Sequence, residues 1–195
     1  MGGWVSRWEP NARGRLEQAA LELFEERGFD AVAVAEIAAR AGLTERTFFR
    51  HFADKREVLF WGQGELSAHL KEVIAEALRT VPPIEAVVAA IEAAARALPD
   101  RPEFARRRKA VIAANVELRE REALKLASMA SAIDAALAGH GVDGTAARLA
   151  AEAGVGVFKV AYDRWLAGTG EAAFAPLVRQ TFAELQTLIA VPAAG

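Results

Sequence analysis

The chain has 195 residues, of which 53% are hydrophobic and 26% charged, and its net charge is −2. This composition provides enough apolar surface for a folded core and excludes general disorder, while the absence of cysteine excludes disulfides and thiolate metal sites. No apolar run reaches the roughly 18 residues that cross a bilayer, and residues 1–15 lack the apolar stretch of a secretory signal, so we expect a cytoplasmic protein with no membrane contact.

Helical periodicity recurs along the chain and strand signals are nearly absent, which predicts an all-α fold of about nine helices. Glycine and proline separate the expected helices. The first four cover residues 11–27, 34–41, 44–51 and 54–79. The other five cover residues 84–98, 103–114, 116–138, 144–167 and 171–189. We expect a small head of residues 1–53 and a larger body of residues 54–195.

Residues 34–51 have the organisation of a helix-turn-helix. Two short helices flank Gly42, which permits a sharp turn, and Thr44 is placed to cap the second helix. Phe48 and Phe52 are four residues apart and share the side of that helix that faces the core. Its other side presents polar residues, and a helix of this kind fits the major groove of DNA.

Residues 28–60 resemble the helix-turn-helix of the TetR family. The resemblance rests on AEIAARAGLTERTFFRHFADKREVL, in which an I-A-x-x-A-G segment leads to T-x-x-x-F/Y-x-x-F and then x-x-K-x-x-L. It implies a transcriptional regulator with a DNA-binding head and a helical body that binds a ligand and dimerises. A two-fold dimer of such heads reads a palindromic operator.

By position, the expected DNA contacts lie on the third expected helix and just after it. Arg46 and Thr47 are the candidates for base edges, because Arg pairs bidentately with guanine and Thr reaches a thymine methyl. His51 and Lys55 are candidates for phosphate. Glu45 either accepts from a cytosine amino group or serves only as a first-turn acid favoured by the helix dipole. The complete expected set is Thr44, Glu45, Arg46, Thr47, Phe49, Arg50, His51 and Lys55.

Three features depart from a strong DNA-binding pattern. Val32 and Ala33 occupy the region where the family usually has a capping Thr, and Phe49 stands where Tyr is common. Residues 1–57 contain nine Lys and Arg against ten Asp and Glu, although phosphate neutralisation supplies much of the affinity for DNA. These departures leave an alternative function, a helical small-molecule-binding or scaffold protein that has lost DNA recognition. Separately, Trp4 and Trp8 belong either to an ordered arm or to a tail.

The body is expected to bind a small hydrophobic ligand between the fourth and eighth helices, in a mainly apolar pocket with a few polar groups. For each aromatic candidate, packing in the core is the competing interpretation and the more common role for such a residue. The candidates are Trp61, Leu66, His69, Phe104, Asn115, Met129, Phe158, Tyr162 and Trp165. The last two helices are apolar enough to form a four-helix interface with a second copy, or else to be internal core. The interface candidates are Val155, Val157, Phe174, Leu177, Phe182 and Leu185.

No pattern indicates catalysis, a metal site or a cofactor. The three histidines are far apart, and the sequence has no HExxH, P-loop, GxGxxG or GxSxG motif. We expect a TetR-like repressor that binds a palindromic operator as a homodimer and is released by a hydrophobic ligand. Gly62 and Gly64, inside the expected fourth helix, suggest a soft point where ligand binding tilts the head.

Overall fold

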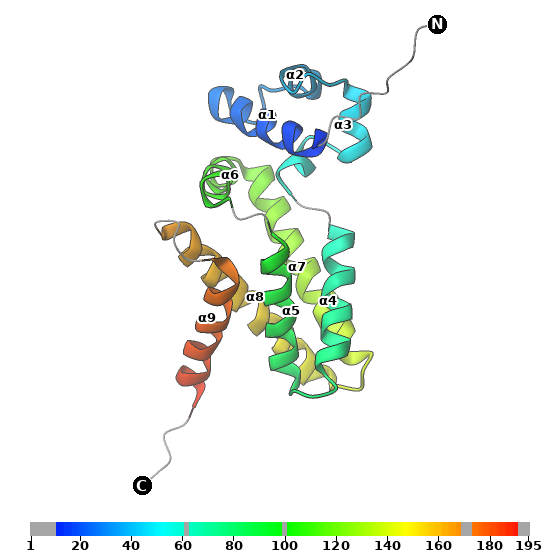
Figure 1. Ribbon diagram of the computed structural model, residues 1–195, viewed down its shortest axis with the longest axis vertical. Coiled ribbons are helices and arrows are strands. Elements are labelled where there is room, and N and C mark those ends of the chain that lie inside the picture. The colour runs from blue at the N-terminus through cyan, green and yellow to red at the C-terminus, as the bar shows by residue number, and fades with distance from the viewer. Residues whose placement is uncertain (1–10, 61–62, 99–100, 169–172, 191–195) are drawn as a thin grey trace, which may run out of the picture. The chain divides into compact units, whose positions relative to one another are not determined.

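The computed structural model describes residues 11–60, 63–98, 101–168 and 173–190. All regular structure in these residues is helical, with nine α-helices, one 3-10 helix and no strand (Figure 1), which confirms the expected all-α fold. The described residues form two compact units. The head unit contains residues 11–60 and 107–119, and the body unit contains the rest. The functional boundary expected after residue 53 stays a prediction.

The head unit is built on α1, whose two ends are fixed by local chemistry. Asn11 Oδ1 accepts a hydrogen bond from the Gly14 N–H (3.1 Å), which caps the first turn, and Gly28 ends the helix with a φ of 80°. The elements are α1 (Ala12–Arg27), α2 (Val34–Arg40), α3 (Glu45–His51) and the 3-10 helix η1 (Arg56–Leu59). Their core includes the fully buried side chains of Leu16, Leu21, Ile37, Phe48 and Leu59.

The continuous helix expected over residues 54–79 is wrong. Asp54 Oδ1 accepts hydrogen bonds from the backbone N–H groups two and three residues ahead (2.8 and 3.1 Å), and a 3-10 helix follows instead. Residues 58–60 are all buried, and one face of an α-helix does not bury three consecutive side chains. The backbone is extended at Phe60 (φ −121°, ψ 136°), and α4 begins only at Gln63.

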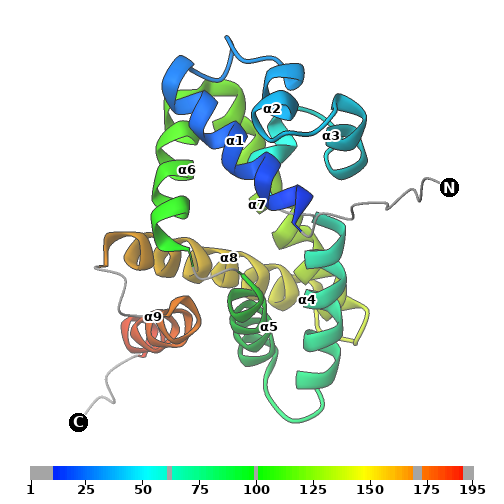
Figure 2. The same ribbon diagram turned by 45° about the horizontal axis from the view of Figure 1, so that its top comes forward.

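The body unit is arranged around α5, which contacts α4, α8 and α9 (Figure 2). Its elements are α4 (Gln63–Ala77), α5 (Pro83–Ala97), α6 (Pro102–Ala114), α7 (Val116–Ala138), α8 (Gly144–Ala167) and α9 (Phe174–Ile189). The end of α6 and the start of α7 belong to the head unit. The body core includes Leu70, Ile74, Val87, Ile91, Ile133, Leu137 and Val178.

Gly64 lies in the first turn of α4, and Gly62 lies outside the described residues, as do Trp4 and Trp8. Gly64 therefore does not lie in the interior of α4, and the soft point expected at these two glycines stays a prediction. Across the helices that the structure describes, none has the length and apolar character needed to cross a membrane. The described side chains also contain no group of three or more His, Cys, Asp or Glu that could hold a metal ion.

Candidate nucleic-acid interface

The turn between α2 and α3 is fixed by a glycine and by backbone hydrogen bonds. Gly42 has a φ of 67°, a conformation that other residues adopt at a cost. The Leu43 N–H donates to the Ala38 carbonyl (2.8 Å), which closes the end of α2 as in a Schellman motif. Phe48 is fully buried and its ring contacts Phe52 (centroids 5.3 Å apart), so one side of α3 is anchored to the head core.

The opposite side of α3 faces solvent. Thr44 caps the helix, as expected: its Oγ1 accepts from the Thr47 N–H (3.2 Å) and lies 3.1 Å from the Thr47 hydroxyl. Phe49 is 53% exposed although it is a large apolar side chain. The exposed strip of α3 consists of Glu45, Arg46, Phe49 and Arg50. These positions form two rows with a spacing of four, so they share one face.

Glu36 caps α2 in place of the missing Thr. Its Oε2 accepts from the Ala33 N–H (2.8 Å), and its Oε1 accepts from Arg27 (2.6 Å). These two hydrogen bonds, that from Arg27 first, hold the pKa of Glu36 below its ordinary value. This cap was not predicted from the sequence. Its signal was a Glu three residues after the N-cap position, which is half of a capping box.

Ion pairs and hydrogen bonds to backbone carbonyls engage most of the Lys and Arg side chains of residues 11–60. Residues 11–60 contain eight Lys and Arg side chains. Arg15 and Lys55 donate to backbone carbonyls, and Arg46 and Arg50 have no hydrogen bond or ion pair with another described residue. The other four form the pairs Arg13–Glu17, Arg27–Glu36, Arg40–Glu26 and Arg56–Asp54.

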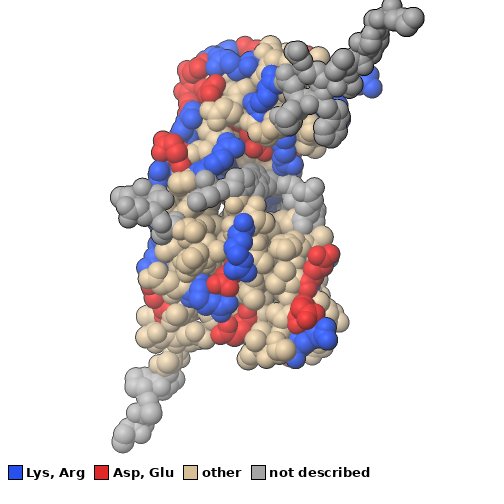
Figure 3. Space-filling model, viewed as in Figure 1, with Lys and Arg blue, Asp and Glu red and all other residues tan. Residues whose placement is uncertain are grey.

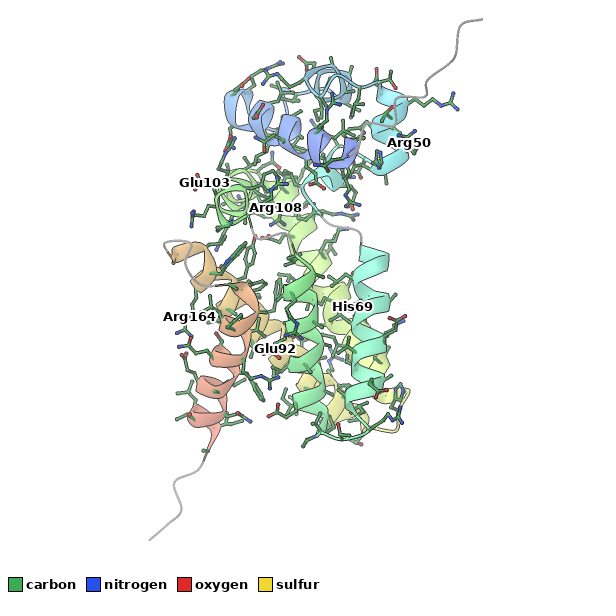
Figure 4. All side chains as sticks on the ribbon, in the orientation of Figure 1. Arg50, His69, Glu92, Glu103, Arg108 and Arg164 are labelled. Atoms are coloured by element: carbon green, nitrogen blue, oxygen red, sulfur yellow. The ribbon has the colours of Figure 1, made fainter. Side chains whose placement is uncertain are left out.

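The two cations of this segment that make neither a hydrogen bond nor an ion pair with a described residue are therefore both on α3, where Figure 4 labels Arg50. Charges of both signs are interspersed over the face of the molecule that Figure 3 shows. A sum of charges along the sequence conceals this arrangement, because it counts paired and unpaired side chains alike.

Lys55 is engaged inside the head unit. Its Nζ donates to the carbonyls of Phe29 (2.7 Å) and Val32 (2.9 Å) and lies 4.1 Å from the centre of the Phe29 ring. His51 is half-buried, and its Nε2 is buried with no hydrogen-bond partner among the described residues. Burial, and then the charges of nearby arginines, lower the pKa of His51. Phosphate contacts by Lys55 and His51 stay predictions.

An aromatic cluster in the body unit brings together three of the expected pocket residues. Phe158, Tyr162 and Trp165 lie along α8, and Phe174 at the start of α9 joins them, with ring centroids 5.5 to 5.9 Å apart. Trp165 is only 5% exposed, and its Nε1 has no hydrogen-bond partner among the described residues. A buried donor without an acceptor is uncommon in native proteins.

The other pocket candidates are dispersed. Met129 lies in the body core, and Leu66 packs against it. His69 lines a shallow groove of about 380 Å³ along α4, where Figure 4 labels it. The Phe104 ring lies 4.3 Å from the Arg101 guanidinium. Trp61 lies outside the described residues.

Asn115 belongs to the head unit. Its Oδ1 accepts from the Leu118 N–H (3.1 Å) and its amide nitrogen donates to the Asp30 carboxylate (3.3 Å). The side chain therefore caps α7 and holds the loop after α1.

The interface candidates on α8 and α9 differ in exposure. Val155, Val157, Phe174 and Phe182 are buried in the body core, and Leu177 and Leu185 are half-buried against it. The same two helices also carry exposed large apolar side chains. These are Leu149 (66% exposed) and Val160 (51%) on α8, and Leu188 (83%) and Ile189 (70%) on α9.

A helix-turn-helix whose exposed strip carries Arg46 and Arg50, followed by a helical body, defines a DNA-binding transcriptional regulator. The family described as "Bacterial regulatory proteins, tetR family" matches residues 17–60, and the family described as "MftR C-terminal domain" matches residues 81–190, more than half of the chain. The chain belongs to the TetR family of transcriptional regulators, which are not enzymes, and has an MftR-type C-terminal domain.

Two curated relatives match in sequence over about a third of their own length. The mycofactocin biosynthesis transcriptional regulator MftR of Mycobacterium tuberculosis is 35% identical over 69 residues, which are 35% of this chain and 33% of the relative. The transcriptional activator FasR of Mycolicibacterium smegmatis is 37% identical over 71 residues, 35% of this chain and 31% of the relative.

Solved structures share the fold over most of the chain. The TetR-family repressor FadR of Thermus thermophilus, in complex with lauroyl-CoA, has a TM-score of 0.54 at 22% identity and covers 94% of this chain and 99% of its own. The regulator FadR of Bacillus subtilis, in complex with stearoyl-CoA, has a TM-score of 0.54 at 19% identity and covers 88% and 96%.

Proposed function

We propose that this regulator is a repressor that binds a palindromic operator as a homodimer, places α3 in the major groove and is released by a hydrophobic ligand. The observation that carries the DNA-binding part is the state of Arg46 and Arg50. Both are exposed on the side of α3 that faces away from the core, and neither pairs with another described residue. Unpaired guanidinium groups on such a helix can bind guanine edges or phosphates without first breaking an ion pair.

The direction of regulation is proposed from the neighbours. The Thermus thermophilus structure is named a repressor, whereas the FasR relative is named an activator. Repression also requires only that a bound dimer block the promoter. No further contact between the described surface and another protein is needed for that role. We place this activity in the cytoplasm, where the operator would be accessible.

Selection of duplexes from a random DNA pool by the purified protein tests the proposal. We expect a palindrome to be enriched. Arg46→Ala should reduce affinity for it roughly 5- to 100-fold, the range for loss of one good base contact, and Thr47→Ala should relax the preference at one position. Arg79→Ala is the control, because Arg79 is an exposed cation in the turn after α4 that pairs with the neighbouring Glu76.

Two results would contradict this proposal. One is that no sequence is enriched. The other is that enrichment is indifferent to Arg46→Ala and Thr47→Ala but sensitive to Arg79→Ala. Either result would favour the alternative, a helical ligand-binding protein that does not read DNA.

The ligand part of the proposal rests on the aromatic cluster. A buried Trp165 Nε1–H without an acceptor costs free energy, and an apolar ligand with a carbonyl oxygen would supply the acceptor while its chain packs on the rings. A fatty acyl thioester has this chemistry. Two structural neighbours are named as complexes with acyl-CoA molecules, which supports the choice of this class.

Lauroyl-CoA is the probe for this part. We expect it to release the protein from its selected operator, and Trp165→Phe, which removes the donor and keeps an aromatic ring, to weaken its effect roughly fivefold to tenfold. Phe174→Leu is the control, since it changes the same cluster without removing a donor. Equal effects of the two substitutions would show that Trp165 acts only by packing.

A further inference from the structure

The carboxylate of Glu45 differs from the other carboxylates of the head unit. It lies at the first position of α3 and is exposed. It makes no hydrogen bond or ion pair with any described residue, and in particular none with the N–H groups of its own first turn. Thr44 already caps that turn. A hydrogen-bonded cap therefore does not account for Glu45, although its place in the first turn of α3 also suits the helix dipole.

The remaining carboxylates of residues 11–60 are engaged. Those of Glu17, Glu22, Glu26, Glu36 and Asp54 pair with arginines of the same segment. Glu25 binds Arg107, and Asp30 accepts from Asn115. Glu57 interacts with the charge of Arg56. Glu45 is thus the one acidic side chain of this described segment that no partner neutralises, and it stands on the helix with the unpaired arginines.

An unpaired carboxylate in the major groove is unfavourable unless it accepts a hydrogen bond, because the phosphates around it are negative. Two base edges donate there. Adenine presents its N6 amino group beside the N7 acceptor, which repels a carboxylate, whereas cytosine presents its N4 amino group as a donor. Cytosine is therefore the base that a glutamate at this position can recognise.

We propose that Glu45 is a specificity-determining residue that accepts a hydrogen bond from the N4 amino group of one cytosine in each operator half-site. This inference rests on the proposed function, since it requires α3 in the major groove. It assigns Glu45 a different role from that of Arg46 and Arg50. The arginines provide attraction to DNA, and Glu45 excludes the half-sites that place thymine, adenine or guanine at its position.

The test compares duplexes selected from a random pool by the wild-type protein, Glu45→Ala and Glu45→Gln. We expect the wild type to prefer cytosine at one symmetry-related position by about 5- to 10-fold, the lower end of the range for a good base contact. Glu45→Ala should reduce that preference to about twofold or less, within the spread of non-contacted positions. Glu45→Gln should shift it toward adenine, because an amide pairs with adenine N6 and N7.

Glu76→Gln is the matched control. Glu76 is an exposed glutamate on α4, so its substitution removes one negative charge without altering α3. We expect this variant to keep the wild-type preference at every position. The affinities of the same variants for a duplex of random sequence measure how much the loss of a carboxylate raises affinity for DNA in general.

The outcomes separate this inference from the function on which it rests. If the wild type selects a palindrome but neither Glu45 variant alters the preference at any position, the inference is overturned and the repressor proposal stands. An even rise in affinity for all sequences would also overturn it, because Glu45 would then act only by repulsion. If the wild type selects no sequence, the proposed function itself fails.

Discussion

Lys55 illustrates how one side chain can be needed for the fold at a position where the family resemblance predicts a DNA contact. Its ammonium group donates to two backbone carbonyls of the loop between α1 and α2. We expect Lys55→Met, which keeps the apolar stem near the Phe29 ring, to lower the free energy of unfolding by roughly 1–3 kcal/mol, because two carbonyls lose a charged donor. Urea unfolding followed by circular dichroism measures this change.

Arg46→Met is the matched control for that substitution. Arg46 is an exposed cation without a partner among the described residues, so its loss should alter stability by no more than about 0.5 kcal/mol. If Lys55→Met leaves stability unchanged and instead reduces the salt dependence of operator binding by about one ion, Lys55 contacts phosphate and its two carbonyl bonds are dispensable.

Which charged side chains near the interface pair with one another could not be predicted from the sequence. The Thr44 cap and the Gly42 turn follow from neighbours within a few residues, and both were predicted. By contrast, Arg40 pairs with Glu26, fourteen residues away, and Arg107 pairs with Glu25, eighty-two residues away. Such pairs form only once the helices pack, so the unpaired state of Arg46 and Arg50 became visible only in the folded head.

At the scale of whole elements, prediction succeeded where one side of a helix is apolar and the other polar. It failed for residues 54–79, because the burial of residues 58–60 has no helical period. It was also ambiguous for α8. That helix is apolar on nearly all sides, so its periodicity does not separate Val157, which faces the core, from Val160, which faces solvent.

Two glycines of α8 provide a matched test of how this helix packs. A Cβ added at Gly154 would overlap Val87 of α5 and lie 3.1 Å from Ile91 Cδ1, whereas one added at Gly156 would meet open space. We expect Gly154→Ala to lower the free energy of unfolding by about 1–2 kcal/mol, since overpacking outweighs the gain in helix propensity. Thermal and urea unfolding at fixed protein concentration measure the difference.

Within a single copy, Gly156→Ala should do the reverse and raise stability by up to about 1 kcal/mol, because there only the helix propensity changes. Gly156 shares the face of α8 with Leu149 and Val160, so the measurement uses the monomeric Leu149→Glu, Val160→Glu variant as its background. A similar gain in both variants would mean that α5 and α8 can separate by a few tenths of an ångström without cost. The close approach at Gly154 would then not hold the body unit together.

At the scale of the whole molecule, net charge gives the protein little general attraction to DNA. The chain carries −2, and in residues 11–60 the cations that make neither a hydrogen bond nor an ion pair with a described residue are Arg46 and Arg50. A single half-site contact would therefore be weak at physiological salt. Two heads held together by one dimer add their binding free energies on a palindrome, so the proposed function requires a stable interface between two copies.

The exposed apolar residues of α8 are the place to test that interface. We expect the double substitution Leu149→Glu and Val160→Glu to produce a folded monomer, because it puts two charges per copy on a surface that a partner would have to bury. Sedimentation should show half the wild-type mass, and operator affinity should fall by about 100-fold or more, since a monomer reads one half-site. Leu124→Glu is the control, because Leu124 is 61% exposed on α7 and should leave both properties unchanged. A double variant that still sediments as a dimer, or a control that dissociates equally, would place the interface elsewhere on the body unit.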